Sequence, residues 1–347
     1  MRETKERLEH LFEQAFLVGE EDITFLLDFT GIIPWENFLL NPRRLRGSDF
    51  LMRWSQGQWS EQSIVSALED TGEFFAIPYG ISSVAPENDP RSAEVYFEFL
   101  DRANAERTKR PDLLVFPKRA QRQISSLLNE LAATTPPEGV ADMEWQDANS
   151  FFAELSPTQR LPFFREDHPI IRALLREALL GVEAENSLWI TEKMPGFHEN
   201  LRPMRRLDGK PGLPKNTVAP TIIIKKEDIE PLRAWEKNNS VPIHIWHIFF
   251  DRAFGISLTK ALSLIKNGYI DGTLQSFQAP GGATTTKTIY KIYHHHAYPL
   301  ATTVEQPELK ADHIVDKNGH ILPFVRFVGG KLQIAPEALD ELRGLIE

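Results

Sequence analysis

Two short apolar runs in this chain carry ionisable residues that could do chemistry. The first is Arg110-Pro-Asp-Leu-Leu-Val-Phe116, and the second is Leu188-Trp-Ile-Thr-Glu-Lys193. Runs this short and apolar are typical of buried strands. A carboxylate among apolar side chains costs several kcal/mol unless a partner or a metal offsets it. Either run alone is also explained by a strand end with its charge in solvent, but together they predict a metal-dependent site.

The residues in these runs suit the hydrolysis of a phosphodiester. Mg²⁺ is commonly held by one or two carboxylates together with substrate oxygens. We expect Asp112 to be the first ligand and Glu192 the second. Lys193 would lie near the scissile phosphate and neutralise the charge that develops there.

Strand geometry leaves the second carboxylate open. Neighbouring side chains on a strand point to opposite faces, so Glu192 and Lys193 share a site only if the strand bulges or ends there. The Pro-Gly pair at 195–196 favours such an end. Otherwise Lys193 shares its face with Thr191, and the second acid comes from Glu94 or Glu98 on a helix expected over 90–106.

Basic residues gather after the second run, although the net charge of the chain is −10. Charges farther apart than about 8 Å are largely screened at physiological salt, so clustering matters more than the total. A solvated surface is the alternative, and for the second cluster below it is equally well supported. The candidate phosphate contacts are Arg202, Arg205, Arg206, Lys210 and Lys225, and a second cluster holds Arg43, Arg44, Arg46 and Arg53.

A polar stretch further along could read bases. Gln275 and Gln278 could each make two hydrogen bonds to adenine in a major groove, and Lys287 could reach guanine. An ordinary polar hairpin is the better-supported explanation of the stretch. His294-His-His296 is a weak zinc candidate, because only two of its side chains would share one face of a strand. His244 and His247 are expected to be core histidines.

Composition excludes several classes of protein. The chain has 347 residues, 41% of them hydrophobic, and no cysteine, which rules out disulfides and thiolate metal sites. It contains no run of eighteen apolar residues, so no membrane span is expected. The charged N-terminus excludes a secretory signal, and we expect a cytoplasmic protein.

The pattern of elements predicts an α/β (α+β) fold, a mixed central sheet flanked by helices. We expect one domain, with a helical N-terminal part (1–88), an α/β core (89–270) with a helical insertion (119–181), and a β-rich C-terminal part (271–347). Turns are expected at Asn318-Gly319 and Gly329-Gly330. The expected helices cover 3–17, 60–70, 90–106, 227–238, 257–267 and the residues after Pro336, and the expected strands cover 110–116, 187–192, 220–225 and 243–250.

Several segments together resemble type II restriction endonucleases of the PD-(D/E)xK superfamily, and the AccI family most closely. The segments are Pro78-Tyr-Gly-Ile-Ser-Ser-Val-Ala-Pro86, Arg110-Pro-Asp-Leu-Leu-Val-Phe116, Thr191-Glu-Lys-Met-Pro195, Arg202-Pro-Met204, Pro220-Thr-Ile-Ile-Ile-Lys-Lys-Glu-Asp228, Ile245-Trp-His-Ile-Phe-Phe-Asp-Arg252 and Lys317-Asn-Gly-His-Ile321.

This resemblance implies a restriction-endonuclease-like fold and a homodimeric, Mg²⁺-dependent enzyme. Its substrate would be double-stranded DNA, cut at a short, near-palindromic sequence. The acid on the superfamily's first site strand corresponds to Asp112, and the lysine of the acid-x-lysine pattern corresponds to Lys193. The residue two before Lys193 is Thr191 instead of an acid, so the second ligand stays open and Lys225 is an alternative lysine. Two other functions remain: a DNA-binding protein whose nuclease site is degenerate, and an acidic interaction protein.

Overall fold

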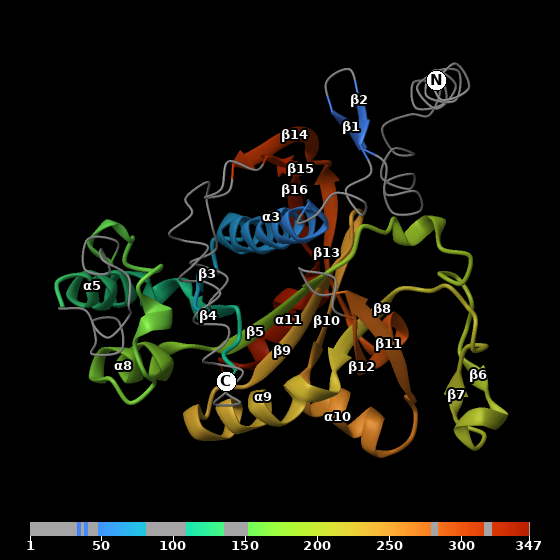
Figure 1. The fold of residues 1–347 in the computed structure, drawn as a ribbon. Coiled ribbons are helices and arrows are strands. Elements are labelled where there is room, and N and C mark those ends of the chain that lie inside the picture. The colour runs from blue at the N-terminus through green and yellow to red at the C-terminus, as the bar shows by residue number, and fades with distance from the viewer. Residues whose placement is uncertain are drawn as a thin grey trace.

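A computed structural model provides the fold of this chain (Figure 1). It describes residues 33–35, 38–40, 48–80, 109–134, 152–278, 284–315 and 321–346. The helices expected at 3–17 and 90–106 lie outside these ranges, as do the side chains of the second basic cluster. Within the described ranges, no helix is both long and apolar enough to cross a membrane.

The largest element is a seven-stranded sheet in the order β16-β13-β10-β9-β5-β4-β3. Strands β5 and β9 run parallel, and every other neighbouring pair is antiparallel. The mixed sheet with flanking helices confirms the predicted fold class. Its strands are β3 (Phe74–Pro78), β4 (Leu113–Pro117), β5 (Leu180–Asn186), β9 (Ile243–Ile248), β10 (Arg252–Ser257), β13 (Tyr298–Glu305) and β16 (Lys331–Ile334).

Helices cover both faces of this sheet because its central strands are apolar on both sides. Alternate residues of β9 enter two different cores: Trp246 packs on the face covered by α3 (Ser48–Asp70), and Ile245 packs on the opposite face with Trp235 of α9 (Lys226–Asn239). Every residue of β9 is buried. The predicted α9 and the next helix, α10 (Leu258–Lys266), are confirmed.

Smaller sheets extend the fold. The three-stranded sheet β11-β12-β8 leads away from the main sheet, and its predicted strand β8 has the alternating burial of a strand with one covered face (Figure 1). The remaining strands are β8 (Thr221–Lys225), β11 (Gly272–Gln278), β12 (Thr284–Tyr293), β14 (Glu308–Val315), β15 (Ile321–Val328), β1 (Ile33–Trp35), β2 (Phe38–Leu40), β6 (Arg202–Pro203) and β7 (Pro211–Gly212).

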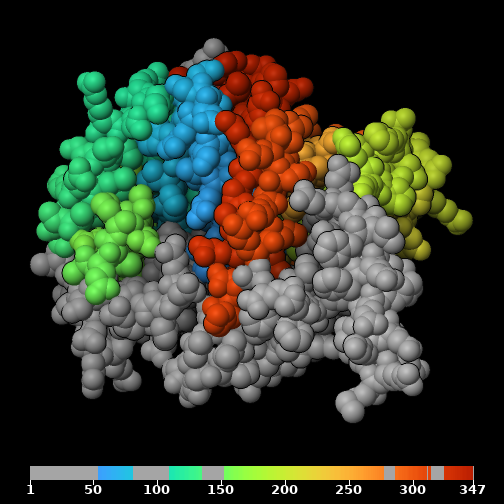
Figure 2. All heavy atoms as spheres, turned by 90° about the horizontal axis from the view of Figure 1, so that it is seen from above, coloured from blue at the N-terminus to red at the C-terminus, as the bar shows by residue number. Residues whose placement is uncertain are grey.

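Helix α3 begins at Ser48, well before residue 60, where the sequence predicts its start with Ser60 as the capping residue. Ser60 was expected at an N-terminus, but it is buried inside the helix, and its hydroxyl donates to the Gly57 carbonyl 2.8 Å away. Serine hydroxyls can bond to the preceding turn in this way, so a serine does not by itself mark a helix start. The long helix contacts β3, β5, β15 and β16, and Figure 2 shows its surface beside that of the C-terminal strands.

The predicted strand at 187–192 is wrong. The strand here is β5, which ends at Asn186, and Thr191–Lys193 form a 3-10 turn. The sequence of β5, Leu-Gly-Val-Glu-Ala-Glu-Asn, follows a helical stretch and carries two acids, so its strand character depends on pairing with β4 and β9. The helical prediction for 119–181 holds for α5 (Gln121–Ala132) and α8 (Pro169–Glu177), but its last residues belong to β5.

The C-terminal part is β-rich, as predicted, and closes with α11 (Pro336–Gly344). Gly329 and Gly330 both have positive φ and connect β15 to β16. The hairpin turn expected here is wrong, because β15 pairs with β14 whereas β16 pairs with β13. The expected turn at Asn318-Gly319 lies outside the described ranges, between the paired strands β14 and β15.

Candidate active site

Asp112 is fixed at the start of β4 by bonds from two neighbouring strands. Its backbone N–H donates to the Val182 carbonyl (2.7 Å), and its carboxylate accepts from the Ala184 N–H (2.8 Å), both in β5. The N–H groups of Tyr79 and Gly80 donate to its carbonyl at 2.7 and 3.0 Å. A Cβ on Gly80 would lie 3.0 Å from the Asp112 Cα, which is tighter than most Cβ contacts, so a larger residue there would require the backbone at Asp112 to shift.

Two further acids come from β5 itself. Glu183 and Glu185 flank Ala184, so both point to the same face of the strand. Glu183 is only 6% exposed, and its Oε2 has no hydrogen-bond partner among the described residues. Burial raises the pKa of Glu183, and the nearby charges of Asp112 and Glu185 add to this shift, so the three carboxylates are close enough to interact.

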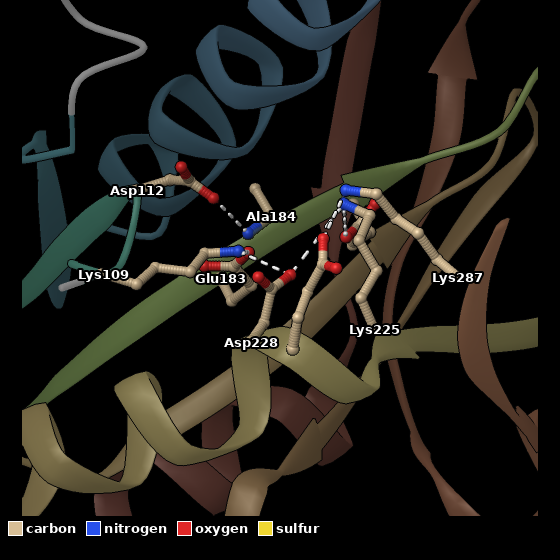
Figure 3. Close-up of polar contacts among 9 residues, drawn as sticks. Lys109, Asp112, Glu183, Ala184, Lys225, Asp228 and Lys287 are labelled. Atoms are coloured by element: carbon tan, nitrogen blue, oxygen red, sulfur yellow. Dashed lines mark hydrogen bonds and ion pairs between the residues drawn. The ribbon is translucent and has the colours of Figure 1, made fainter. Parts of the chain in front are cut away.

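Two lysines reach this cluster from outside β5 (Figure 3). The Lys109 ammonium pairs with Glu183 and lies 2.9 Å from an Asp228 carboxylate oxygen. The Lys225 ammonium lies 3.2 Å from Glu185 and 4.0 Å from Asp228. Glu183, Glu185, Lys225 and Asp228, together with apolar side chains, line a cavity of about 10 Å³, which is about the size needed for one water molecule.

Burial dominates the electrostatics of the two inner carboxyls. It raises the pKa of Asp112 to about 7, and the charge of Glu61 on α3 is the next cause. It also raises the pKa of Glu183 to about 8, although Lys109 opposes the shift. Burial disfavours the Lys109 ammonium, but Glu183 and Asp228 outweigh it and raise the lysine's pKa. A divalent cation would favour the ionised form of both carboxyls.

The residues fit Mg²⁺ better than a metal with an all-protein ligand set. Within the described part of the chain, no three His, Cys, Asp or Glu side chains form a ready metal-binding group. Mg²⁺ does not need one, because it usually takes one or two carboxylates and completes its shell with water and substrate oxygens. Asp112 and Glu183 could supply those carboxylates, with the unpartnered Glu183 Oε2 as a free acceptor.

Glu192 and Lys193 occupy a different place from the one predicted. The Glu192 carboxylate pairs with Arg252, and its N–H lies 3.3 Å from a carboxylate oxygen of Asp251. Both partners lie at the turn between β9 and β10, beyond the end of β5. Lys193 follows on the same 3-10 turn with its side chain exposed. The alternative acids Glu94 and Glu98 lie outside the described ranges.

Sequence reasoning found Asp112 and the alternative Lys225 but missed the other members of the cluster. Glu183 and Glu185 were hidden because 119–181 was assigned to helices and the strand was placed after them. Two acids at a spacing of two residues, after the apolar Leu-Gly-Val of 180–182, were the available signal. Nothing local marks Asp228, which reaches the site from the first turn of α9.

Some of the candidate DNA-contacting side chains are exposed, and one is hydrogen-bonded to the rest of the fold. Arg202 and Arg205 are exposed on the ribbon formed by β6 and β7, which extends from the body of the fold, and Lys210 is half-buried there (Figure 1). Arg206 is instead tied to the fold, because its guanidinium donates to Asp271 (2.9 Å) and to the Leu213 carbonyl (2.7 Å).

The base-reading candidates lie on the hairpin of β11 and β12. Gln275 is exposed, and its backbone is paired in register with Lys287. The side chain of Gln278 is not among those that the structure describes. The Lys287 ammonium pairs with Glu227 near the acidic cluster (Figure 3). Lys287 therefore links the hairpin to the start of α9.

The buried histidines are core residues, as predicted. The Nδ1 of His244 lies 2.8 Å from the Tyr298 hydroxyl, and His247 stacks on Phe249. Burial lowers the pKa of each to about 4, so both are neutral at pH 7. The segment 294–296 is a 3-10 turn rather than the expected β segment.

Residues 216–347 match the family model described as AccI restriction endonuclease. The match includes Lys225, Asp228 and the C-terminal strands, but Asp112 and Glu183 lie before it. No curated protein and no solved structure shows significant similarity to the chain.

Proposed function

We propose that this chain is a type II restriction endonuclease that cuts duplex DNA with Mg²⁺, and the match of residues 216–347 to the AccI restriction endonuclease family model supports this proposal. The observation that carries the metal-dependent chemistry is the cluster around β5. Asp112 is hydrogen-bonded to the backbone between Glu183 and Glu185, and a buried Glu183 oxygen has no partner among the described residues. Buried carboxylates of this kind are stable as anions only next to a cation.

Each residue of the cluster has a defined task in this proposal. Asp112 and Glu183 would hold the ion, and Glu185 would hold either the ion or its water. When bound, Mg²⁺ would neutralise charge on the phosphate and lower the pKa of the attacking water. Lys225 would lie beside the scissile phosphate, where its ammonium would stabilise developing negative charge.

DNA would be held by residues outside the cluster. Arg202, Arg205 and Lys210 on the β6–β7 ribbon are proposed to contact phosphates. Gln275 and Lys287, with Gln278, are proposed to face base edges. A near-palindromic sequence would be met by two copies of the chain related by a two-fold axis, so we propose a homodimer.

A plasmid cleavage assay tests the proposal. The wild-type protein is expected to cut with Mg²⁺ and to be inactive with EDTA. Asp112→Ala and Glu183→Gln are expected to bind DNA with near wild-type affinity in Ca²⁺ but not to cut. Cleavage by Asp112→Ala at the wild-type rate would remove the cluster from the mechanism.

A DNA-binding protein without cleavage is the second candidate, and one observation favours it. Two residues after Glu183, where the acid-x-lysine pattern has its lysine, this chain has Glu185. The lysine could have been lost, or Lys225 could supply the ammonium from β8. Specific DNA binding without cleavage in Mg²⁺ would support this second function.

A further inference from the structure

We propose that Asp228 is a positioning residue that gives the two site lysines a second carboxylate partner, so that Glu183 and Glu185 can exchange their lysine contacts for a divalent cation. The inference rests on the function proposed above. The ion pairs of Asp228 within the cluster are with Lys109 and Lys225, so it acts on the carboxylates of β5 through these lysines.

The contacts form one chain of alternating charge. It runs from Glu183 to Lys109, then to Asp228, then to Lys225 and finally to Glu185. Among these five residues, Asp228 is the one that contacts both lysines. Each lysine is therefore shared between one candidate metal ligand and Asp228 (Figure 3).

The charge balance of the cluster gives Asp228 its effect. When a cation favours their ionised forms, Asp112, Glu183, Glu185 and Asp228 are four carboxylates facing two ammonium groups, and the charge of Glu61 on α3 adds to this excess of negative charge. Without the Asp228 charge the excess would be smaller, and both lysines would have only the metal ligands as partners. A bound cation and the two lysines would then compete for the same oxygens.

Helix α9 fixes the position of Asp228, whereas the two lysines are held only by their long side chains. Asp228 lies in the first turn of α9, where the helix dipole favours an acid, and its side chain is mostly buried at 18% exposure. Lys109 and Lys225 have long, flexible side chains that can turn toward Asp228 without a backbone shift. Asp228 is therefore held in position by the helix, and the lysine side chains are the more flexible members of the cluster.

The test measures Mg²⁺ binding by calorimetry on the full chain without DNA. Asp228→Asn is expected to weaken Mg²⁺ binding by about 10–100-fold, the usual cost of losing an outer-shell partner. Asp228→Glu, which keeps the charge, is expected to restore most of the affinity. Lys109→Gln removes one competing ammonium, so it is expected to bind Mg²⁺ more tightly than the wild type. The double variant is expected to lie between the two single ones.

Glu230→Gln is the matched control, because Glu230 is an exposed acid on the same helix whose partner is Arg233. It is expected to bind Mg²⁺ as the wild type does. Asp228→Asn binding Mg²⁺ with wild-type affinity, or Lys109→Gln binding it more weakly than the wild type, would overturn the inference. A wild-type protein that shows no Mg²⁺ binding and no cleavage would instead overturn the proposed function, so the two failures can be told apart.

Discussion

Lys225 and Lys193 are the two candidates for the proposed ammonium beside the scissile phosphate, and their contacts in the structure distinguish them. Lys225 lies 3.2 Å from Glu185 inside the acidic cluster, whereas Lys193 is exposed on the turn that holds Glu192. Lys225→Ala is expected to slow plasmid cleavage by about a hundredfold or more, the usual effect of losing a charge that stabilises the transition state. Lys193→Ala is expected to cut at nearly the wild-type rate. DNA binding in Ca²⁺ serves as the control for folding, and the reverse order of the two rates would return Lys193 to the site.

The raised carboxyl pKa values predict how stability depends on pH. The pKa of Glu183 is about 8 in the folded chain, mainly because of burial, and the unfolded value is near 4.5. A carboxyl with a higher pKa in the folded state takes up protons on folding, so its contribution to stability is full at low pH and is lost as pH rises through the folded value. In EDTA, we expect Glu183 to lower the Tm of the wild type progressively between about pH 5 and pH 8.

The comparison with Glu183→Gln isolates this effect. Buried His244 and His247 have lowered pKa values and act in the opposite direction, so they stabilise the fold as pH rises toward 6.5. Both proteins share these histidines, so the difference in Tm reports Glu183. The variant should match the wild type near pH 5 and melt higher near pH 8. A constant difference across this range would show that Glu183 does not titrate there.

At the scale of elements, the sheet was predicted better than its central strand. Strands such as β8 and β9 were found because their apolar runs match the burial of their residues. β5 was missed because Glu183 and Glu185 interrupt its apolar pattern, and long-range pairing with β4 and β9 makes it a strand. The same two acids lie at the centre of the candidate site. Because acidic residues inside a strand contradict its apolar pattern, the strand and its candidate site residues were both missed.

The close pairing of β10 and β13 can be tested at one glycine. A Cβ on Gly255 would lie 2.3 Å from the Tyr298 ring, whose hydroxyl also accepts a hydrogen bond from Trp246 (2.8 Å). Gly255→Ala is therefore expected to lower the free energy of unfolding by about 1–3 kcal/mol, as overpacking of a core does. Urea denaturation measures the change. Gly344→Ala, at the end of α11 with no atom within 4 Å of its Cβ, is the control and should leave stability nearly unchanged.

At the scale of the whole molecule, the proposed function requires an acidic protein to bind an acidic polymer. The net charge of −10 repels DNA at long range, but at physiological salt only charges within about 8 Å act strongly. The β6–β7 ribbon carries exposed Arg202 and Arg205 away from the acidic body of the fold. Local contact by such a ribbon allows binding without an overall positive charge.

The salt dependence of DNA binding tests this role of the ribbon. Each phosphate contact contributes about −0.9 to the slope of log affinity against log salt. Arg202→Ala with Arg205→Ala is expected to weaken binding to specific and unrelated duplexes alike and to make the slope about two units shallower per chain. Arg165→Ala with Arg172→Ala, two exposed arginines near α8, removes the same charge elsewhere and should leave the slope unchanged. Equal slopes for the ribbon variant and the wild type would mean that the duplex is held elsewhere.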